Sequence, residues 1–280
     1  MISKTIFSLP QTLLVIIVLL IVIKFVLKYN NSSKKDVPKL AIANAQNVGQ
    51  RKRQEDSFAT IRDEEQVLAV VADGMGGFHS GKEASELITK NFIEQFCRTY
   101  DINSVNQFLI NTLHDSNQKL QERIGTEKIG TTLIAAMIEN DLLHWTAVGD
   151  SHLYLYRNQQ LSQLNTDHIF AKKLQKSYRA GEISRYKMLN HPQRERLISY
   201  VGQDNLAEID YSIDPRELKA GDKVVLCTDG VYNTLSELEF SQLLEQQRDI
   251  QEIAEEIIAK VLSKEEPKQD NATIIILEKN

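Results

Sequence analysis

Four acidic sites in this 280-residue chain share one local pattern, in which an Asp or Glu stands beside Gly, Asn or another acid at one end of an apolar run. They are Glu55-Asp56, Asp73-Gly74, Asp229-Gly230 and Asp270-Asn271. A carboxylate at a strand end is held on a rigid element, and an adjacent Gly lets the backbone turn sharply and can expose a carbonyl as a ligand. Hard oxygen ligands of this kind select Mg²⁺ or Mn²⁺. Few His residues accompany them, so the pattern does not favour a zinc site.

A single Asp-Gly pair is more often a turn than a ligand, so the metal interpretation depends on the motifs around the four sites. Six motifs occur in order along the chain: Gly49-Gln50-Arg51-Lys52-Arg53-Gln54-Glu55-Asp56, Ala72-Asp73-Gly74-Met75-Gly76-Gly77, Gly130-Thr131-Thr132, Val148-Gly149-Asp150-Ser151, Cys227-Thr228-Asp229-Gly230 and Asp270-Asn271-Ala272-Thr273. This ordered set resembles the metal-dependent protein phosphatase family, also called protein phosphatase 2C, in its bacterial form. The resemblance covers about residues 40–278.

The resemblance implies an α+β fold, with a central antiparallel β-sandwich flanked by helix pairs. It also implies a two-metal centre at one rim that hydrolyses phosphoserine and phosphothreonine in proteins. By the family pattern, Asp73 would bridge two Mn²⁺ or Mg²⁺ ions, and the Gly74 carbonyl would bind one of them. Asp229 and Asp270 would ligate the other ion. Glu55 and Asp56 would act on the second ion directly or through water. Asp56 is also expected to be a catalytic residue.

Two further residues complete the implied site. Arg51 would clamp the substrate phosphate without touching an ion, and Asp150 would help to hold a third, weaker ion. The chemistry is consistent with this, because two cations about 3.5–4 Å apart can lower the pKa of a bridging water, orient it and neutralise developing charge. Arg51 suits a phosphate because its planar fork can make two parallel hydrogen bonds. Its fixed offset from Glu55-Asp56 is what separates it from an ordinary solvated basic turn.

The chain departs from the family pattern at several positions near the motifs, among them Phe78-His79, which shifts by one place a His that often follows the double Gly. Met75 stands where many eukaryotic members have His, so that proposed general acid is absent, as it commonly is in bacterial members. Gln54 replaces the usual Asn of the first motif, and His152 stands where Arg is usual after Gly-Asp-Ser. None of these changes removes an expected metal carboxylate, so we expect activity to be retained. His152 is interpreted as hydrogen-bonding scaffold, since no metal-ligand spacing links the histidines.

The elements that must position these residues can be read from residue 40 onward, where no internal repeat or second linker is evident. Short β-branched runs predict strands at Phe58–Ile61, Val67–Ala72, Thr131–Ile138, Leu142–Val148, Leu153–Tyr156, Lys223–Cys227 and Ala272–Leu277. Helical spacing predicts helices at Lys82–Arg98, Ser104–Ile124, Ser236–Glu245 and Ile250–Leu262. Grouped strands with paired helices favour antiparallel sheets over a doubly wound parallel sheet.

Residues 168–200 differ from the rest, with eight Lys or Arg, two Glu and little apolar rhythm. The segment Leu197–Gly202 resembles the family's return from a mobile flap, which predicts a flap around 167–200 lying over the metal centre. Its basic charge contrasts with an acidic domain. Two interpretations stay open: the charge steers acidic substrates, or it is a solvated loop face.

The N-terminus predicts a membrane anchor. Leu13–Ile23 is an unbroken apolar run, and residues 6–27 carry one charge, Lys24, near the end. At about 1.5 Å per residue, a helix of that length spans about 33 Å, enough for a bilayer core. A cleaved signal peptide is the alternative, but no small-residue cleavage site follows. Because most Lys residues follow the run, we expect residues 28–39 to be a tether and the domain, residues 40–280, to be cytoplasmic.

The composition bounds the possible partners. Residues 41–280 hold 27 basic and 37 acidic residues, and such an acidic body argues against nucleic-acid binding. Cys97 and Cys227 lie far apart, so a reducing compartment fits better than a disulfide framework. The leading hypothesis is a membrane-anchored protein-serine/threonine phosphatase that opposes a serine/threonine kinase on phosphorylated proteins. The alternative is a catalytically weak adaptor of the same fold that binds phosphorylated partners.

Overall fold

The structure is a computed structural model that describes residues 40–63, 66–76, 80–99, 104–124, 129–206 and 208–280, together with Lys24. The chain divides into two units, Met1–Lys39 and Leu40–Asn280. Apart from Lys24, the predicted membrane helix at 6–27 and the tether at 28–39 lie outside the described residues. Among the residues that are described, no helix has the length and apolar character needed to cross a membrane. The unit Leu40–Asn280 carries all six motifs.

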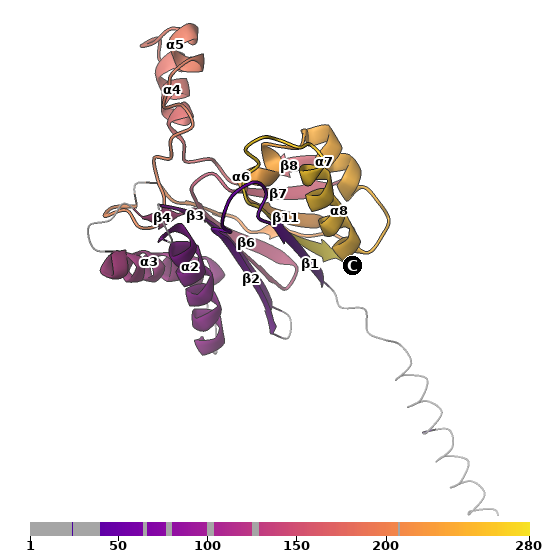
Figure 1. The fold of residues 1–280 in the computed structure, drawn as a ribbon. Helices are drawn as coiled ribbons and strands as arrows, with labels where there is room; N and C mark the ends of the chain where they lie inside the picture. The colour runs from indigo at the N-terminus through magenta and orange to yellow at the C-terminus, as the bar shows by residue number, and fades with distance from the viewer. Residues whose placement is uncertain are drawn as a thin grey trace, which may run out of the picture. The chain divides into compact units, whose positions relative to one another are not determined.

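Two antiparallel sheets form the centre of this unit (Figure 1). The first sheet has the strand order β1 (Leu40–Asn47), β12 (Ala272–Lys279), β11 (Lys223–Cys227), β7 (His152–Arg157) and β8 (Gln160–Gln163). The second has the order β10 (Arg216–Glu217), β6 (Leu142–Val148), β5 (Leu133–Glu139), β3 (Gln66–Met75) and β2 (Asp56–Asp63). Two short strands extend it, since β4 (Gly130–Thr131) pairs with β3 and β9 (Asp210–Tyr211) pairs with β6.

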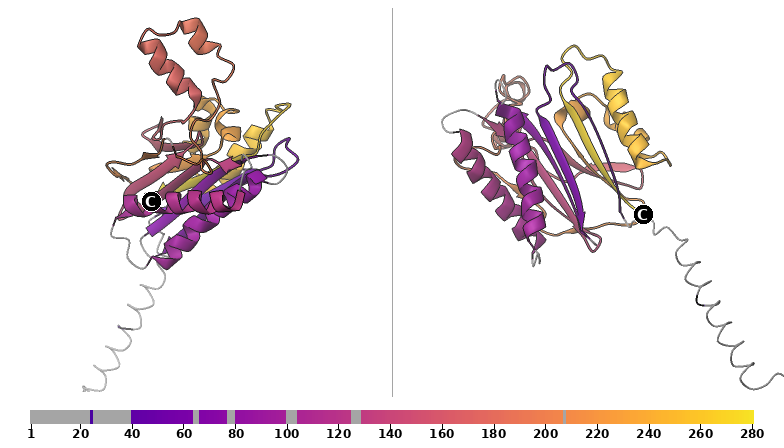
Figure 2. Two further views of the ribbon diagram at one scale, coloured as in Figure 1. Left: turned by 90° about the vertical axis from the view of Figure 1, so that its left-hand side faces the viewer. Right: turned by 60° about the horizontal axis from the view of Figure 1, so that its bottom comes forward.

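Helices cover the outer face of each sheet, so the unit has four layers (Figure 2). The helices α2 (Ser80–Arg98) and α3 (Val105–Ile124) pack on the second sheet. The helices α7 (Glu237–Leu244) and α8 (Ile250–Leu262) pack on the first sheet, together with the short helix α6 (Asp229–Tyr232). One apolar cluster lies between each sheet and its helices, and a third lies between the two sheets.

The side chains of the central strands alternate between the two faces of the sheet, and this explains the layers. In β3, Leu68 and Val70 pack in the cluster with α2 and α3, whereas Val67, Ala69 and Val71 pack between the sheets. Successive side chains of a strand point to opposite faces, so a strand buried on both sides reads as a continuous apolar run. Both faces are covered here, and the strand is therefore held rigidly up to its end at Met75.

The predicted α+β fold with antiparallel sheets and helices is confirmed, and the differences are local. The strand predicted at Thr131–Ile138 is two strands, interrupted at Thr132, whose N–H donates to the carbonyl of Asp73 at 2.9 Å. The strand β1 was not predicted, and neither were two helices in the basic segment, α4 (Phe170–Arg179) and α5 (Arg185–Leu189). The helix α4 is amphipathic, but it is rich in charged and polar residues and buries only Leu174 among its own residues, so its sequence resembles a solvated segment; no residue of α5 is buried.

The helices α4 and α5 form a flap that projects from the body on a narrow neck (Figure 1). Isolated bridges join Ile169 to Leu197 and Thr131 to Val201 at its base. The N–H of Phe170 donates to the carbonyl of Arg196 at 2.9 Å within the same neck. The neck is thus tied to β4, and the helices extend outward from it.

Candidate functional site

Asp56 and Asp73 meet at one rim of the sandwich. Asp56 begins β2 and is the ladder partner of Asp73 near the end of β3. The Oδ2 atom of Asp56 accepts hydrogen bonds from the hydroxyls of Thr228 at 2.9 Å and Thr273 at 2.6 Å. Its Oδ1 atom is buried and has no hydrogen-bond partner among the described residues. Burial, assisted by the charges of Asp229 and Asp270, raises the pKa of Asp56 to about 7.

Two threonines fix the backbone of Asp73. Its N–H donates to Thr132 Oγ1 at 2.9 Å, and its carbonyl accepts from Thr131 Oγ1 at 2.8 Å and from the Thr132 N–H at 2.9 Å. Burial and the charge of Asp56 hold the pKa of the Asp73 carboxyl well above its ordinary value. The charges of Asp229, Asp150 and Asp270 act in the same direction. The structure therefore brings five of the predicted site residues together as mutually repelling carboxylates.

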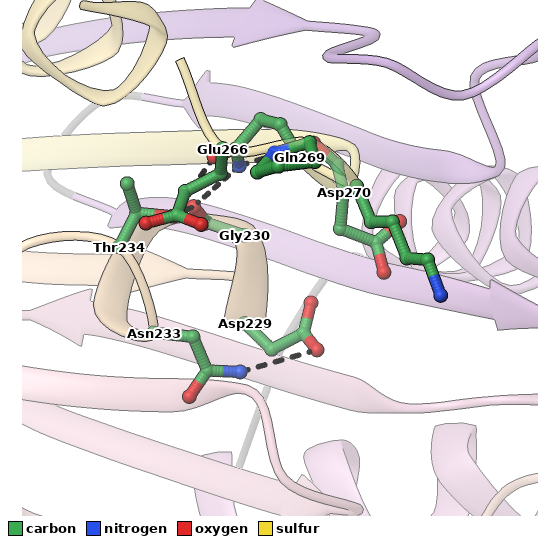
Figure 3. A pocket seen from close by; sticks show the side chains of 9 residues that line it. Asp229, Gly230, Asn233, Thr234, Glu266, Gln269 and Asp270 are labelled. Atoms are coloured by element: carbon green, nitrogen blue, oxygen red, sulfur yellow. Dashed lines mark hydrogen bonds between the residues drawn. The ribbon is translucent and has the colours of Figure 1, made fainter. Parts of the chain in front are cut away.

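Asp229 and Asp270 border a pocket of about 460 Å³ at this rim (Figure 3). Asp229 follows β11 and Asp270 precedes β12, and the two strands are antiparallel neighbours, so a separation of 41 positions in the chain becomes a close approach. Asn233 Nδ2 lies 3.5 Å from Asp229 Oδ2. Burial and the neighbouring Asp270 raise the pKa of Asp229 to about 6.

Asp150 lies after β6, on the side of the cluster nearest the flap. Burial and the charge of Asp229 raise its pKa to about 7, and the charges of Asp167 and Glu195 at the flap base add to this. Its carbonyl accepts a hydrogen bond from the Tyr232 hydroxyl at 2.8 Å. The base of the flap, rather than its two helices, is thus the part that faces the carboxylates.

Glu55 and Gly74 are held through their backbones. The Gly74 N–H donates to the Glu55 carbonyl at 3.2 Å, and the Ser85 hydroxyl donates to the same carbonyl at 2.6 Å. The Glu55 N–H donates to Asn271 Oδ1 at 2.7 Å. A Cβ atom on Gly74 would lie 2.0 Å from the Gly81 carbonyl oxygen, so any side chain at position 74 would displace α2 from this rim.

Arg51 lies at the outer edge of the cluster. Its Nη2 atom is 2.5 Å from Asp270 Oδ2, and 55% of its side chain is exposed. Its charge lowers the pKa of Asp229, against the larger raising effects of burial and Asp270. The sequence predicted that Arg51 contacts the phosphate and no ion, and this stays a prediction; the structure adds a contact between its guanidinium and Asp270, a predicted metal ligand.

His152, which the sequence suggested as scaffold, is enclosed by contacts of its own. Its Nε2 lies 3.0 Å from Asp167 Oδ1, its Nδ1 lies 2.6 Å from the Tyr154 hydroxyl, and its ring stacks on Tyr232 with centroids 3.6 Å apart. These contacts join the flap base to the segment that carries Asp229. They account for both ring nitrogens and leave the imidazole no part in the carboxylate cluster.

The cluster fits a hard divalent cation. Asp56 Oδ1 and Asp229 Oδ1 are buried carboxylate oxygens without hydrogen-bond partners in the described part of the chain, and buried charges of this kind require a counter-charge. Every donor is oxygen, which suits Mn²⁺ or Mg²⁺. In the residues that are described, however, no three His, Cys, Asp or Glu side chains converge tightly enough to define an ion position. The structure thus shows a carboxylate cluster and not individual coordination spheres.

Sequence reasoning missed the residues that support this cluster. They are neutral hydrogen-bonding side chains beside the acids: Thr131 and Thr132 on Asp73, Thr228 and Thr273 on Asp56, and Asn271 on Glu55. Asn271 also donates through Nδ2 to the carbonyls of Val48 and Arg53, which shapes the loop that carries Arg51. All five lie inside the quoted motifs, so their membership of those motifs was the signal that could have identified them.

Comparisons with known proteins agree with the motif pattern. A family model described as protein phosphatase 2C matches residues 45–270. The serine/threonine phosphatase stp of Listeria innocua is 29% identical over 238 residues, which are 82% of this chain and 92% of that protein. The solved serine/threonine phosphatase of S. agalactiae superposes with a TM-score of 0.77 at 24% identity, covering 86% of this chain and 100% of that one.

A further solved structure is the catalytic domain of the serine/threonine protein phosphatase PstP in complex with two manganese ions. It superposes with a TM-score of 0.68 at 24% identity, over 85% of this chain and 97% of that one. These structures support the fold, and the family match spans most of the sequence. The chain therefore belongs to the protein phosphatase 2C family.

Proposed function

We propose that this chain is a metal-dependent protein-serine/threonine phosphatase that hydrolyses phosphoserine and phosphothreonine. The observation that carries the proposal is the cluster of five aspartates, in which two buried carboxylate oxygens lack a hydrogen-bond partner among the described residues. The similar proteins of Listeria innocua and S. agalactiae are named serine/threonine phosphatases, which supports phosphoserine and phosphothreonine as the substrates.

Two Mn²⁺ or Mg²⁺ ions are the proposed cofactors, with a third, weaker ion beside them. The groups that would hold the first two are Asp73, Asp229, Asp270, Glu55, Asp56 and the Gly74 carbonyl, and Asp150 would help to hold the third. When bound, the ions would supply charge neutralisation and an activated water for attack on phosphorus. The two manganese ions reported for the PstP catalytic domain support this assignment.

The chain's own residues position the reactants. Thr228 and Thr273 hold one oxygen of Asp56 and leave the other available to a further partner. Arg51 contacts Asp270 through Nη2, and its largely exposed fork retains donors that can bind two oxygens of a phosphate. Met75 carries no exchangeable proton, so it cannot act as the acid toward the leaving serine or threonine oxygen.

The test is hydrolysis of a phosphothreonine peptide by the full-length chain in detergent, with Mn²⁺ and then with EDTA. We expect turnover that needs the metal, together with little turnover of a matched phosphotyrosine peptide. Binding of the phosphothreonine peptide without turnover at saturating Mn²⁺ would instead support the adaptor alternative. Turnover that survives EDTA would contradict the metal-dependent mechanism.

We also propose that residues 6–27 anchor the enzyme in a membrane with the domain in the cytoplasm, where its substrates would be phosphorylated by a serine/threonine kinase. The support is the apolar run and the excess of Lys after it. The full-length chain should stay in the membrane fraction after carbonate extraction, and a chain beginning at Leu40 should not. Release of the full-length chain by carbonate would contradict the anchor.

A further inference from the structure

A second cavity, of about 540 Å³, lies where the neck of the flap meets the second sheet. Met75 at the end of β3 lines one side, and residues of the neck and the segment after it line the others. We call it the flap-base cavity, and its lining includes Met75, Lys173, Arg196, Leu197, Tyr200 and Gln203. Among the described residues it shares no lining residue with the pocket beside Asp229 and Asp270.

The flap-base cavity adjoins the carboxylate cluster along β3. Asp73 and Met75 are two positions apart in the same strand, so their side chains leave the same face about 7 Å from each other. Met75 is also the ladder partner of Gly130 in β4, which lines the cavity. A substrate whose phosphate sits at the cluster would therefore have neighbouring residues within reach of the cavity.

Two cations, Lys173 and Arg196, line this cavity. Neither forms an ion pair with a described residue, whereas their neighbours do, because Lys172 lies 3.6 Å from Asp167 and Arg194 lies 2.9 Å from Glu195. The Arg196 guanidinium lies over the Phe170 ring at 5.6 Å. This cation–π contact uses none of the guanidinium N–H groups as donors to an oxygen, so they can bind an anion.

The remaining walls suit a short apolar stem that ends in a polar group. Met75, Leu197 and Tyr200 provide apolar surface. The Gln203 amide also lines the cavity, and its Nε2 group is the part that can donate to a carboxylate, because its buried Oε1 atom is an acceptor. An aspartate or glutamate side chain combines these features, since it carries a carboxylate on one or two methylene groups.

We propose that the flap-base cavity binds an acidic side chain of the phosphoprotein substrate, two residues from the phosphorylated residue. The spacing follows from the 7 Å step along β3, because an extended peptide advances about 3.3 Å per residue. The inference rests on the proposed phosphatase function and adds a sequence preference to it. The basic flap would then recognise one acidic side chain at a defined position, in addition to attracting acidic proteins in general.

The test uses phosphothreonine peptides that carry a single Glu at successive positions on either side, each matched to a Gln peptide. With the full-length enzyme in detergent and Mn²⁺, we expect kcat/KM for Glu two residues away, on one side, to exceed that for Gln by about 5- to 10-fold, as for one charge-assisted pair. Lys173→Ser and Arg196→Ser should each reduce that ratio toward one. A similar ratio at every position would contradict a defined subsite.

Lys176→Ser is the matched control. Lys176 lies one turn from Lys173 in α4, is exposed and does not line the cavity, so its loss should leave the Glu-to-Gln ratio unchanged. An equal loss of the ratio in Lys176→Ser would show long-range steering and would overturn the subsite. A preference for a second phosphothreonine in place of Glu, with no preference for Glu, would overturn the assignment to a carboxylate.

Two failures are distinguishable in this design. Equal hydrolysis of the Glu and Gln peptides by the wild-type enzyme would overturn the subsite and leave the proposed function intact. Absence of metal-dependent hydrolysis with every peptide would overturn the proposed function itself, and the subsite with it.

Discussion

Asp56 and Asp73 lie directly opposite each other in the antiparallel ladder of β2 and β3. Like charges that face each other across a strand pair destabilise a sheet, and burial raises the pKa of both groups. Neutral residues at either position would serve the fold better. Stability therefore does not account for this pair, and the proposed cation site gives a reason for it.

The first prediction concerns the stability of the protein with and without metal. Mn²⁺ at about 100 times its dissociation constant should raise the melting temperature by roughly 5–10 °C, because an ion that binds the folded state stabilises it by mass action. Asp73→Asn should melt higher than the wild type in EDTA, since one repelling charge is gone, and should gain little from Mn²⁺. Thermal unfolding followed by circular dichroism measures both effects. A Mn²⁺ shift in Asp73→Asn equal to that of the wild type would exclude Asp73 as a ligand.

The second prediction concerns turnover. Asp73→Asn, Asp229→Asn and Asp270→Asn should each reduce kcat by orders of magnitude, because loss of one ligand impairs charge neutralisation and generation of the nucleophile together. Asp214→Asn is the control, since Asp214 is exposed and outside the cluster. Steady-state kinetics on a phosphothreonine peptide at saturating Mn²⁺ would measure the effect. Near-normal kcat in a well-folded cluster variant would contradict the proposed ligand set.

The third prediction concerns Arg51, for which the structure changes the expectation. From sequence alone, loss of Arg51 should raise KM for phosphopeptide and leave the Mn²⁺ activation curve little changed. Its contact with Asp270 predicts that Arg51→Ala also shifts Mn²⁺ activation to lower concentration, because a cation that competes for that carboxylate is removed. Activity measured over a Mn²⁺ titration at two substrate concentrations separates the effects.

Arg51→Lys distinguishes charge from geometry at the same position. It keeps the cation near Asp270 but lacks the planar fork, so KM should stay raised while the Mn²⁺ dependence stays near that of the wild type. A wild-type KM in Arg51→Lys would show that the phosphate needs only a positive charge at this position.

The fold was predictable because its motifs coincide with buried strands. The runs before Asp73 and Asp229 and after Asp270 are continuous apolar segments, and these became β3, β11 and β12. The flap helices α4 and α5 were not predictable, because they project from the body and bury little apolar surface. The helix α4 is amphipathic, but its low apolar content gives it the composition of a solvated loop, and this composition hid the helix in the sequence.

The sequence predicted which acidic residues belong to the cluster, but it did not predict how they are arranged in space. Asp56 and Asp270 are 214 positions apart, and only the antiparallel order of the strands brings them to one rim. The contact of Arg51 with Asp270 depends on the loop shaped by Asn271, whose amide reaches two carbonyls that no spacing rule identifies. The ligand roles of these residues stay predictions, which the first two experiments test.

The fourth prediction concerns the pH dependence of stability at His168, a histidine outside the cluster with 3% of its surface exposed. Its Nδ1 accepts a hydrogen bond from the Gly149 N–H at 3.1 Å, so the neutral ring is the bonded form. Burial lowers the pKa of His168, although the charges of Glu208, Asp210 and Asp167 oppose this. A histidine whose pKa is lower in the folded state stabilises the fold fully above its unfolded pKa, near 6.5, and loses that contribution as the pH falls.

The measurement is the free energy of unfolding of the wild type and of His168→Asn between pH 5 and 8. Asn keeps an acceptor for the Gly149 N–H and has no titrating group, so its curve should fall less steeply below pH 6.5, by at most one proton or about 1.4 kcal/mol per pH unit. Both proteins share every other titrating group, so the difference between their curves isolates His168. His114→Asn, at an exposed position on α3, controls for the loss of a histidine as such. Parallel curves for the wild type and His168→Asn would show that His168 does not couple stability to pH.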